Sequence, residues 1–149
     1  MLLQWAVGLR PGEACKMRMA DLCLKTGDLV TPRDGKTGQR ALCFDTQGMF
    51  AKALRAWMAV RPPGPYLFGG EKPIRVNTYH ITIERCCDRI GVPRMKPYAL
   101  RHTYACDLMH QGAAIADISA ALGHASVLTT ARYYLHCDPA TMRRMNAGR

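Results

Sequence analysis

Acidic residues are scarce in this chain. Only 11 Asp and Glu side chains stand against 21 Lys and Arg in 149 residues, which gives a formal net charge of +10. A surplus of this size favours a polyanionic partner, above all nucleic acid. Long apolar runs are also missing, because none reaches the roughly 18 residues of a membrane-spanning helix. We therefore expect no membrane association, and we interpret the apolar segment 1–7 as a buried helix, since it lacks the basic leader of a signal peptide.

Metal-binding patterns are also missing from the sequence. The seven cysteines include no Cys-x-x-Cys pair, and His80, His110 and His136 have no ligand spacing, so we expect neither a metal nor another cofactor. The adjacent residues Cys86 and Cys87 cannot easily join in a normal disulfide. We interpret most cysteines as small buried residues in a reducing cytoplasm. Together with the basic charge, this favours a cytoplasmic, nucleoid-associated protein.

Helical periodicity dominates the chain. Apolar residues recur at helical spacing from 49 to 60, and the proline-rich segment 61–65 ends that helix. Gly112 and Gly123 are suited to the ends of two later helices, and Pro11 can occupy the first position of an early one. The predicted helices with both ends assigned span 1–10, 49–60, 77–90 with Asn77 as its cap, 100–111 and 113–122. Three more have only a predicted start. One begins near Pro11, a short one begins at Ser126 or Thr129 and carries Tyr133, and a last one begins at Asp138.

Residues 21–44 differ from the rest of the chain. Segments 29–31 and 40–44 have strand character, and a turn-forming run from Asp34 to Gly38 separates them. They predict a small antiparallel sheet. A chain of this length forms one domain by default. The expected fold class is therefore mainly α with a small antiparallel β-sheet (α+β).

An arginine, a histidine and a tyrosine follow one another in the last third of the chain, as Arg101, His124 and Tyr133. Metal-free cleavage of a phosphodiester needs a nucleophile, cations or donors aimed at the phosphate oxygens, and a proton for the leaving oxygen. A tyrosine can be that nucleophile and would form a covalent phosphotyrosine. Each residue taken alone has a simpler explanation, as a solvated charge, a helix cap or a core side chain.

Five sequence features occur in the order and at the spacing typical of one enzyme family. They are Gly8–Glu13 around Arg10, Gly35–Gly38 around Lys36, Leu100–Ala105 around Arg101, Leu122–His124, and Tyr133 nine residues after that histidine. Together they resemble the catalytic domain of the tyrosine recombinases, the family of phage-type integrases and Xer-type recombinases. The resemblance covers residues 8–135 and implies a DNA strand transferase.

The resemblance implies a role for each of these residues. Arg10 and Arg101 would bind the non-bridging phosphate oxygens, for which a planar guanidinium has suitable geometry. Lys36 would protonate the leaving 5′ oxygen, and His124 would hydrogen-bond a phosphate oxygen or assist proton transfer. Tyr133 would form a 3′-phosphotyrosine link without a metal. The implied reaction is site-specific recombination or integration by cleavage and rejoining of DNA, as in a phage or another mobile element.

One candidate catalytic position departs from the family pattern. Tyr98 stands three residues before Arg101, where the family usually has a histidine. A tyrosine can donate a hydrogen bond, but it is not a cation near pH 7. We therefore expect lowered or shifted activity. Glu13 is expected to orient the helix that follows Arg10 and not to react.

Alternatives remain open for two residues and for the function. Lys25 is a rival to Lys36 as the proton donor, and Tyr134 is a rival to Tyr133 as the nucleophile. An inactive DNA-binding remnant of an integrase is one alternative function. A type IB topoisomerase-like enzyme, which only relaxes DNA, is another.

The resemblance also implies a domain organisation and partners. We expect residues 1–149 to form a single catalytic domain that is short at its N-terminal end, without the core-binding domain that precedes it in the family. Segment 138–149 is a candidate for docking on a neighbouring subunit. The implied partners are double-stranded DNA, further copies of the chain in a homo-tetramer on two DNA sites, and an accessory DNA-bending protein.

Overall fold

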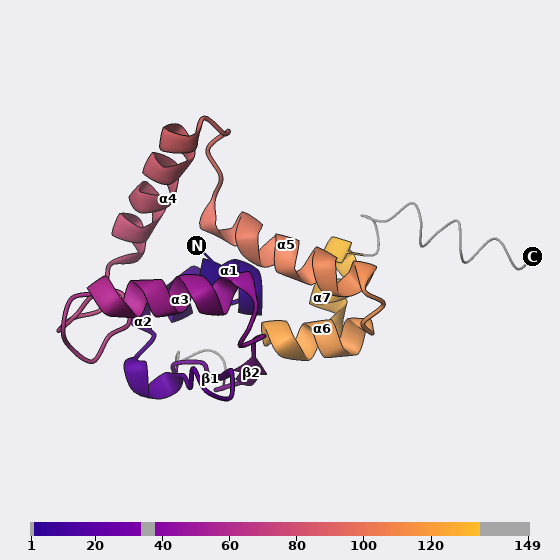
Figure 1. Ribbon diagram of the computed structural model, residues 1–149. Helices are drawn as coiled ribbons and strands as arrows, with labels where there is room; N and C mark the ends of the chain where they lie inside the picture. The colour runs from indigo at the N-terminus through magenta and orange to yellow at the C-terminus, as the bar shows by residue number, and fades with distance from the viewer. Residues whose placement is uncertain (1, 34–37, 135–149) are drawn as a thin grey trace, which may run out of the picture.

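The computed structural model describes residues 2–33 and 38–134, with side chains as far as Arg132. These residues form a mostly helical body with one small antiparallel sheet, as the sequence predicts (Figure 1). The elements are α1 (Leu2–Val7), α2 (Pro11–Lys16), a 3-10 turn (Met19–Asp21), β1 (Asp28–Val30), β2 (Ala41–Cys43), α3 (Met49–Val60), α4 (Val76–Ile90), α5 (Pro97–His110), α6 (Ile115–Leu122) and α7 (Val127–Tyr134). Among these described helices, none has the length and apolar character that crossing a membrane requires.

Several helix ends lie where local chemistry places them. Pro11 is the first residue of α2, where its missing N–H costs no hydrogen bond. Gly91 and Gly123 end α4 and α6 in the left-handed conformation, with φ of 70° and 64°. Ser126 precedes α7, and its Oγ accepts a hydrogen bond from the backbone N of Leu128 at 3.2 Å. The alternative start at Thr129 is therefore wrong.

Other predicted helix boundaries are also wrong. Helix α1 ends at Val7 and not at residue 10, because Gly8 follows it at positive φ, and α6 begins at Ile115 and not at residue 113. Asn77 does not cap α4, because the helix already begins at Val76 and Asn77 lies within its first turn. Helix α5 begins at Pro97, three residues before the predicted start at Leu100, because proline is well suited to the first helical position. The helix predicted from Asp138 lies outside the described residues.

The sheet is the short hairpin that residues 21–44 predict. Strands β1 and β2 pair antiparallel, with Leu29 opposite Leu42. The pairing continues beyond the strands, since the backbone N of Thr31 donates to the O of Arg40 at 2.9 Å. Leu29 is buried, so the hairpin packs one face against the helices. Lys36 lies between the strands in sequence and is outside the described residues.

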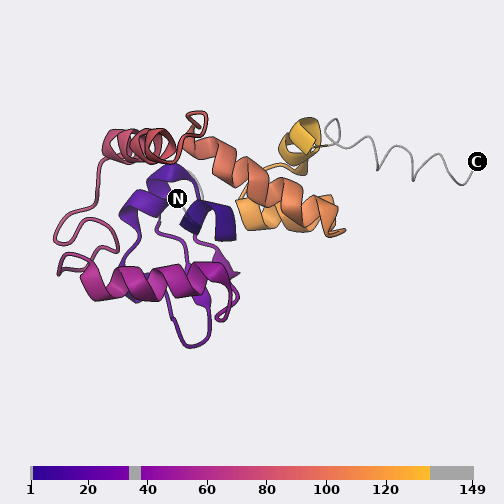
Figure 2. The same ribbon diagram turned by 45° about the horizontal axis from the view of Figure 1, so that its top comes forward.

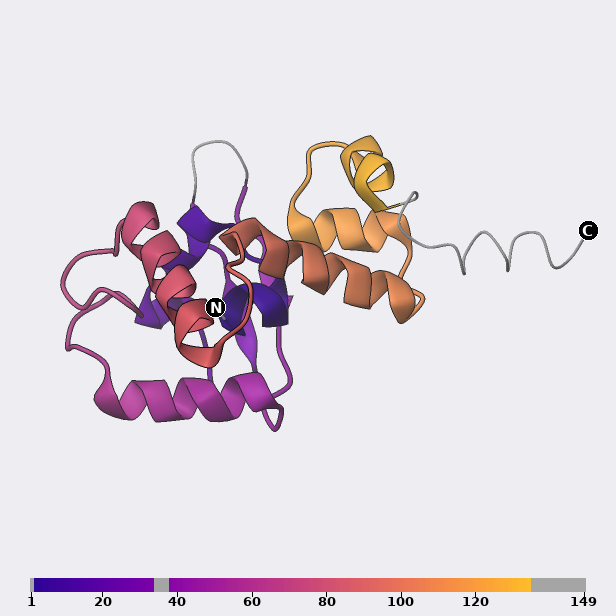
Figure 3. The ribbon, with the colours of Figure 1, turned by 90° about the horizontal axis from the view of Figure 1, so that it is seen from above.

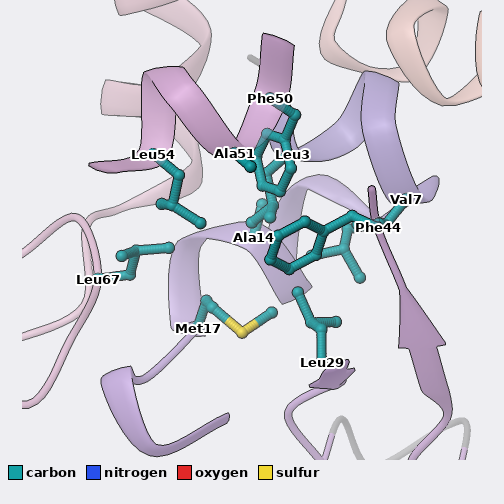
Figure 4. Close-up of a cluster of buried hydrophobic side chains, with 11 residues drawn as sticks. Leu3, Val7, Ala14, Met17, Leu29, Phe44, Phe50, Ala51, Leu54 and Leu67 are labelled. Atoms are coloured by element: carbon teal, nitrogen blue, oxygen red, sulfur yellow. The ribbon is translucent and has the colours of Figure 1, made fainter. Parts of the chain in front are cut away.

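The main core lies where α1, α2 and α3 meet the hairpin (Figure 4). Phe44 and Phe50 contact one another edge to face, with ring centroids 4.9 Å apart. The other buried members are Leu3, Val7, Leu9, Ala14, Met17, Leu29, Ala51, Leu54 and Leu67. Apolar burial at this junction holds the hairpin and the start of α2 in place.

Two smaller clusters attach the remaining helices. Helix α4 packs against α2 through Cys15 and Ile83, and α5 packs against α6 through Ala105 and Ile118. Helix α1 lies between α3 and α5 (Figure 2). Helix α6 lies between α5 and α7 (Figure 3). The packing therefore brings the end of α1, the middle of α5 and the C-terminal end of α6 to one region.

Candidate active site

Arg10 is held in place by a buried carboxylate. It precedes α2 in an extended conformation, and its backbone N donates to Oε2 of Glu13 at 2.7 Å. Its Nη1 lies 3.1 Å from Oε1 of the same residue. Its Nη2 donates to the carbonyl O of Gly123 at 2.7 Å, across 113 residues of sequence. Glu13 thus orients Arg10 itself, whereas the sequence predicted only that it orients the helix that follows.

Arg101 is buried on α5, with 5% of its surface exposed. Its Nη1 donates to the carbonyl O of Gly8 at 2.6 Å, and its Nη2 donates to that of Leu122 at 2.5 Å. Nη2 also lies 3.3 Å from Nε2 of His124. The positive φ of Gly8, 65°, ends α1 beside this guanidinium. Arg101 therefore ties the ends of α1 and α6 to α5.

His124 follows the glycine that ends α6. Its Nδ1 lies 2.8 Å from Oγ1 of Thr130, a buried residue of α7. A guanidinium can only donate, so Nε2 accepts from Arg101, and Nδ1 carries the proton that is donated to Thr130. Burial lowers the pKa of His124 below its ordinary 6.5, and the positive charges of Arg101, Arg10 and Arg40 lower it further.

A third arginine, which sequence reasoning missed, completes this cluster. Arg40 precedes β2, and its Nη1 and Nη2 donate to Oε1 and Oε2 of Glu13 at 3.0 and 2.9 Å. Its Nε donates to the carbonyl O of Ala121 at 3.1 Å. No local motif distinguishes Arg40 in the sequence. The almost fully buried carboxylate of Glu13 requires cationic partners, but this burial is not visible in the sequence.

The three arginines converge on the C-terminal end of α6. Arg40, Arg101 and Arg10 donate to the carbonyls of residues 121, 122 and 123 respectively. These carbonyls have no partners within the helix and mark the negative end of its dipole, which stabilises cations. Glu13 is the carboxylate that the arginines share, so the cluster keeps a net positive charge. Such a cluster can bind an anion with two or three negatively charged oxygens.

The structure describes the remaining candidate residues to different extents. Tyr98 lies in the first turn of α5 with 60% of its surface exposed, and in the described part of the chain it makes no hydrogen bond to Arg101 or His124. Tyr133 lies in α7, one helical turn after Thr130, whose hydroxyl contacts His124. The roles assigned to Tyr98, Tyr133 and Lys36 therefore stay predictions.

Two further features of the described residues bear on the site. No three His, Cys, Asp or Glu side chains within 2–33 and 38–134 gather in the way metal ligands would. An apolar groove of about 450 Å³ lies between α1, α3 and α4, and Leu3, Trp57 and Ile83 are among the residues that line it. No residue of the arginine cluster lines this groove.

Comparison with known proteins agrees with the fold and with the resemblance. Tyrosine recombinase XerC of Corynebacterium glutamicum is 30% identical over 137 residues, which cover 88% of this chain and 44% of the relative. Tyrosine recombinase XerA of Pyrococcus horikoshii is 26% identical over 138 residues, which cover 89% of this chain and 48% of the relative. The chain thus spans about half the length of the relatives it matches.

Solved structures show the same fold. The crystal structure of XerA recombinase matches with a TM-score of 0.80 and 27% identity, over 98% of this chain and 55% of that one. XerH site-specific recombinase bound to palindromic difH substrate matches with a TM-score of 0.78 and 21% identity, over 97% of this chain and 43% of that one. The profile of the phage integrase family matches residues 1–140. The chain therefore belongs to the phage integrase family, the tyrosine recombinases.

Proposed function

We propose that this chain contains the catalytic centre of a DNA strand transferase that cleaves and rejoins double-stranded DNA through a 3′-phosphotyrosine intermediate. The observation that supports it most directly is the meeting of Arg10, Arg101 and His124 at the C-terminal end of α6. These side chains come from three separate segments of the chain. They provide two guanidinium groups and an imidazole within one contact network, which suits the non-bridging oxygens of a phosphodiester.

In the proposed reaction, Tyr133 loses its phenol proton to solvent, its oxygen attacks the phosphorus, and the bond from phosphorus to the 5′ oxygen breaks. The leaving 5′ oxygen takes a proton, for which Lys36 is the proposed donor. Arg10 and Arg101 offset the negative charge that the pentacoordinate transition state spreads over its oxygens. Rejoining reverses the step, with a 5′ hydroxyl attacking the phosphotyrosine. Proton transfer and charge neutralisation are thus assigned to side chains, without a metal ion.

His124 has a pKa that suits a change of role when phosphate binds. Burial and the neighbouring arginines lower this pKa, so the imidazole is neutral near pH 7 and accepts from Arg101 at Nε2. A bound phosphodiester would bring negative charge to the cluster and raise the pKa again. His124 would then donate a hydrogen bond to a phosphate oxygen. Tyr98, at the start of α5, is proposed to donate a second hydrogen bond in place of the family's usual histidine.

DNA is the proposed substrate because of both charge and relatives. The chain carries a formal charge of +10, and among the structural neighbours the Tn1549 integrase is in complex with transposon right end DNA and the XerH recombinase is bound to its difH substrate. Because this charge would neutralise DNA phosphates, we expect strongly salt-dependent DNA binding. Assembly as a homo-tetramer on two DNA sites, with an accessory DNA-bending protein, is part of the same proposal.

A covalent-adduct assay tests the proposed function. The protein is incubated with supercoiled DNA in EDTA, the reaction is stopped with detergent, and DNA-linked protein and relaxed circles are measured. The expected result is an adduct that disappears in Tyr133→Phe and persists in the matched control Tyr134→Phe. DNA binding at low salt without any adduct would instead support a DNA-binding remnant. An adduct that Tyr134→Phe abolishes would assign the nucleophile to the neighbouring tyrosine.

A further inference from the structure

We propose that Arg40 is a positioning residue for catalysis, which acts through Glu13 and the end of α6 to hold Arg10 in its phosphate-binding position. The inference rests on the proposed function, because it concerns the same anion site. Arg40 itself is assigned no contact with the reacting atoms. Its importance comes from the residues that it connects, which lie far apart in the sequence.

Arg10 and Arg40 share the carboxylate of Glu13. Glu13 is 1% exposed, so its charge must be compensated by nearby donors. Arg40 meets both carboxylate oxygens, at 3.0 and 2.9 Å. Arg10 approaches the same carboxylate with its backbone N on Oε2 and its Nη1 on Oε1. The two Nη atoms of Arg40 therefore occupy the positions beside the carboxylate oxygens that Arg10 would need to bind Glu13 with both of its own Nη atoms.

The consequence for Arg10 follows from this geometry. With Arg40 present, Arg10 turns its Nη2 toward the carbonyl of Gly123, at 2.7 Å. Without Arg40, the buried carboxylate would attract both terminal nitrogens of Arg10, since this arginine would be its nearest remaining cation. Such a rotation would draw Nη2 away from Gly123 and from the neighbouring Arg101 and His124.

The position of Arg40 is itself fixed by its surroundings. Its backbone N donates to Oγ1 of the buried Thr31 at 2.9 Å, and its Nε donates to the carbonyl O of Ala121 at 3.1 Å. Its side chain also packs against Gly123, where a Cβ would overlap the guanidinium. Only 9% of the side chain is exposed. A rigidly held cation of this kind can determine the geometry of its neighbours.

The test compares Arg40→Gln, which removes the charge, with Arg40→Lys, which keeps it but loses the fork. Arg55→Gln is the matched control, because Arg55 is exposed on α3 and donates to the carbonyl of Thr46. The double variant Glu13→Gln/Arg40→Gln removes the unpaired carboxylate as well. The folded fraction in urea, the affinity for DNA, and the rate of adduct formation at saturating DNA are measured for each.

For Arg40→Gln we expect the adduct rate at saturating DNA to fall by about 100-fold, as for a misplaced catalytic group. The affinity for DNA should change by no more than about threefold, because a duplex contacts the basic protein at many phosphates and the displaced Arg10 accounts for only one of them. Arg40→Lys should recover part of the rate. The double variant should fold better than Arg40→Gln, since no buried carboxylate is left unpaired, while its rate stays low.

The outcomes separate this inference from the proposed function. If adduct rate and folded fraction fall in parallel in all variants, Arg40 is purely structural and the inference is overturned. If the wild-type protein forms no adduct, the proposed function fails, and binding of inorganic sulfate is followed instead through the NMR signals of His124. A sulfate affinity at least about tenfold weaker in Arg40→Gln than in Arg55→Gln would still support positioning. An unchanged affinity would overturn it.

Discussion

The replacement Arg101→Lys tests the structural basis of the anion site. The guanidinium of Arg101 serves two carbonyls in different directions, Gly8 O at 2.6 Å and Leu122 O at 2.5 Å. A lysine ammonium keeps the charge but has no fork, so we expect it to reach one carbonyl and leave the other buried without a partner. Losing a hydrogen bond to a charged donor costs about 1.5–3 kcal/mol.

We therefore expect Arg101→Lys to lower the free energy of unfolding by about 2–3 kcal/mol. For a chain of this size that corresponds to a decrease in Tm of about 5–10 °C. Urea unfolding followed by circular dichroism measures the change. The matched control is Arg55→Lys, an exposed site where the change should stay within about 0.5 kcal/mol. If Arg101→Lys also stays within this limit, the two carbonyl contacts do not hold the ends of α1 and α6 together.

Three further predictions concern backbone conformation and pH. Gly8→Ala should destabilise the fold by about 2–4 kcal/mol in a urea titration, because φ is positive and the new Cβ would overlap the ring of Tyr104. The control Gly91→Ala is also at positive φ, but no atom lies within 4 Å of the new Cβ, so it should cost only about 1 kcal/mol. His124 should titrate by NMR below its ordinary pKa of 6.5, and stability should fall as pH decreases through that value, because the unfolded chain takes up the proton more readily; an NMR pKa at or above 6.5 would refute this. Burial raises the pKa of Glu13, but the hydrogen bonds and charges of the two arginines outweigh it, so the pKa is lowered and the stability that this carboxylate provides should be lost as pH falls below about 4.5. Glu13→Gln should accordingly cost about 3 kcal/mol at pH 7, with a smaller difference from wild type in acid; a difference independent of pH would contradict the assignment.

Much of the fold could be predicted from the sequence because the signals are local. The periodicity of residues 49–60 gives α3 at the predicted bounds, and Gly123 ends α6 as a left-handed cap. The predicted starts of several helices were wrong. Helix α5 begins at Pro97 and not at Leu100, because a proline is well suited to the first helical position. Helix α4 begins at Val76 although Asn77 is the better cap by propensity.

The candidate site was only partly predictable, since it depends on contacts distant in sequence. The motifs predicted Arg10, Arg101 and His124, and the structure brings these three together. Arg40 was missed because its partners, Glu13 and Ala121, lie 27 and 81 residues away and no short pattern joins them. A backbone carbonyl at a helix end can accept a hydrogen bond from a distant arginine whatever the local residue types are, so the local sequence does not indicate such a contact.

Identification of the residue that becomes linked to DNA tests the central claim most directly. The adduct formed in EDTA would be digested with nuclease and trypsin, and the peptide 133–143 would be sequenced by mass spectrometry with DNA labelled at one end or the other. We predict a nucleotide on Tyr133, joined through the 3′ phosphate of the cleaved strand. A nucleotide on Tyr134 or on another residue, a 5′ linkage, or no linked peptide at all would contradict it.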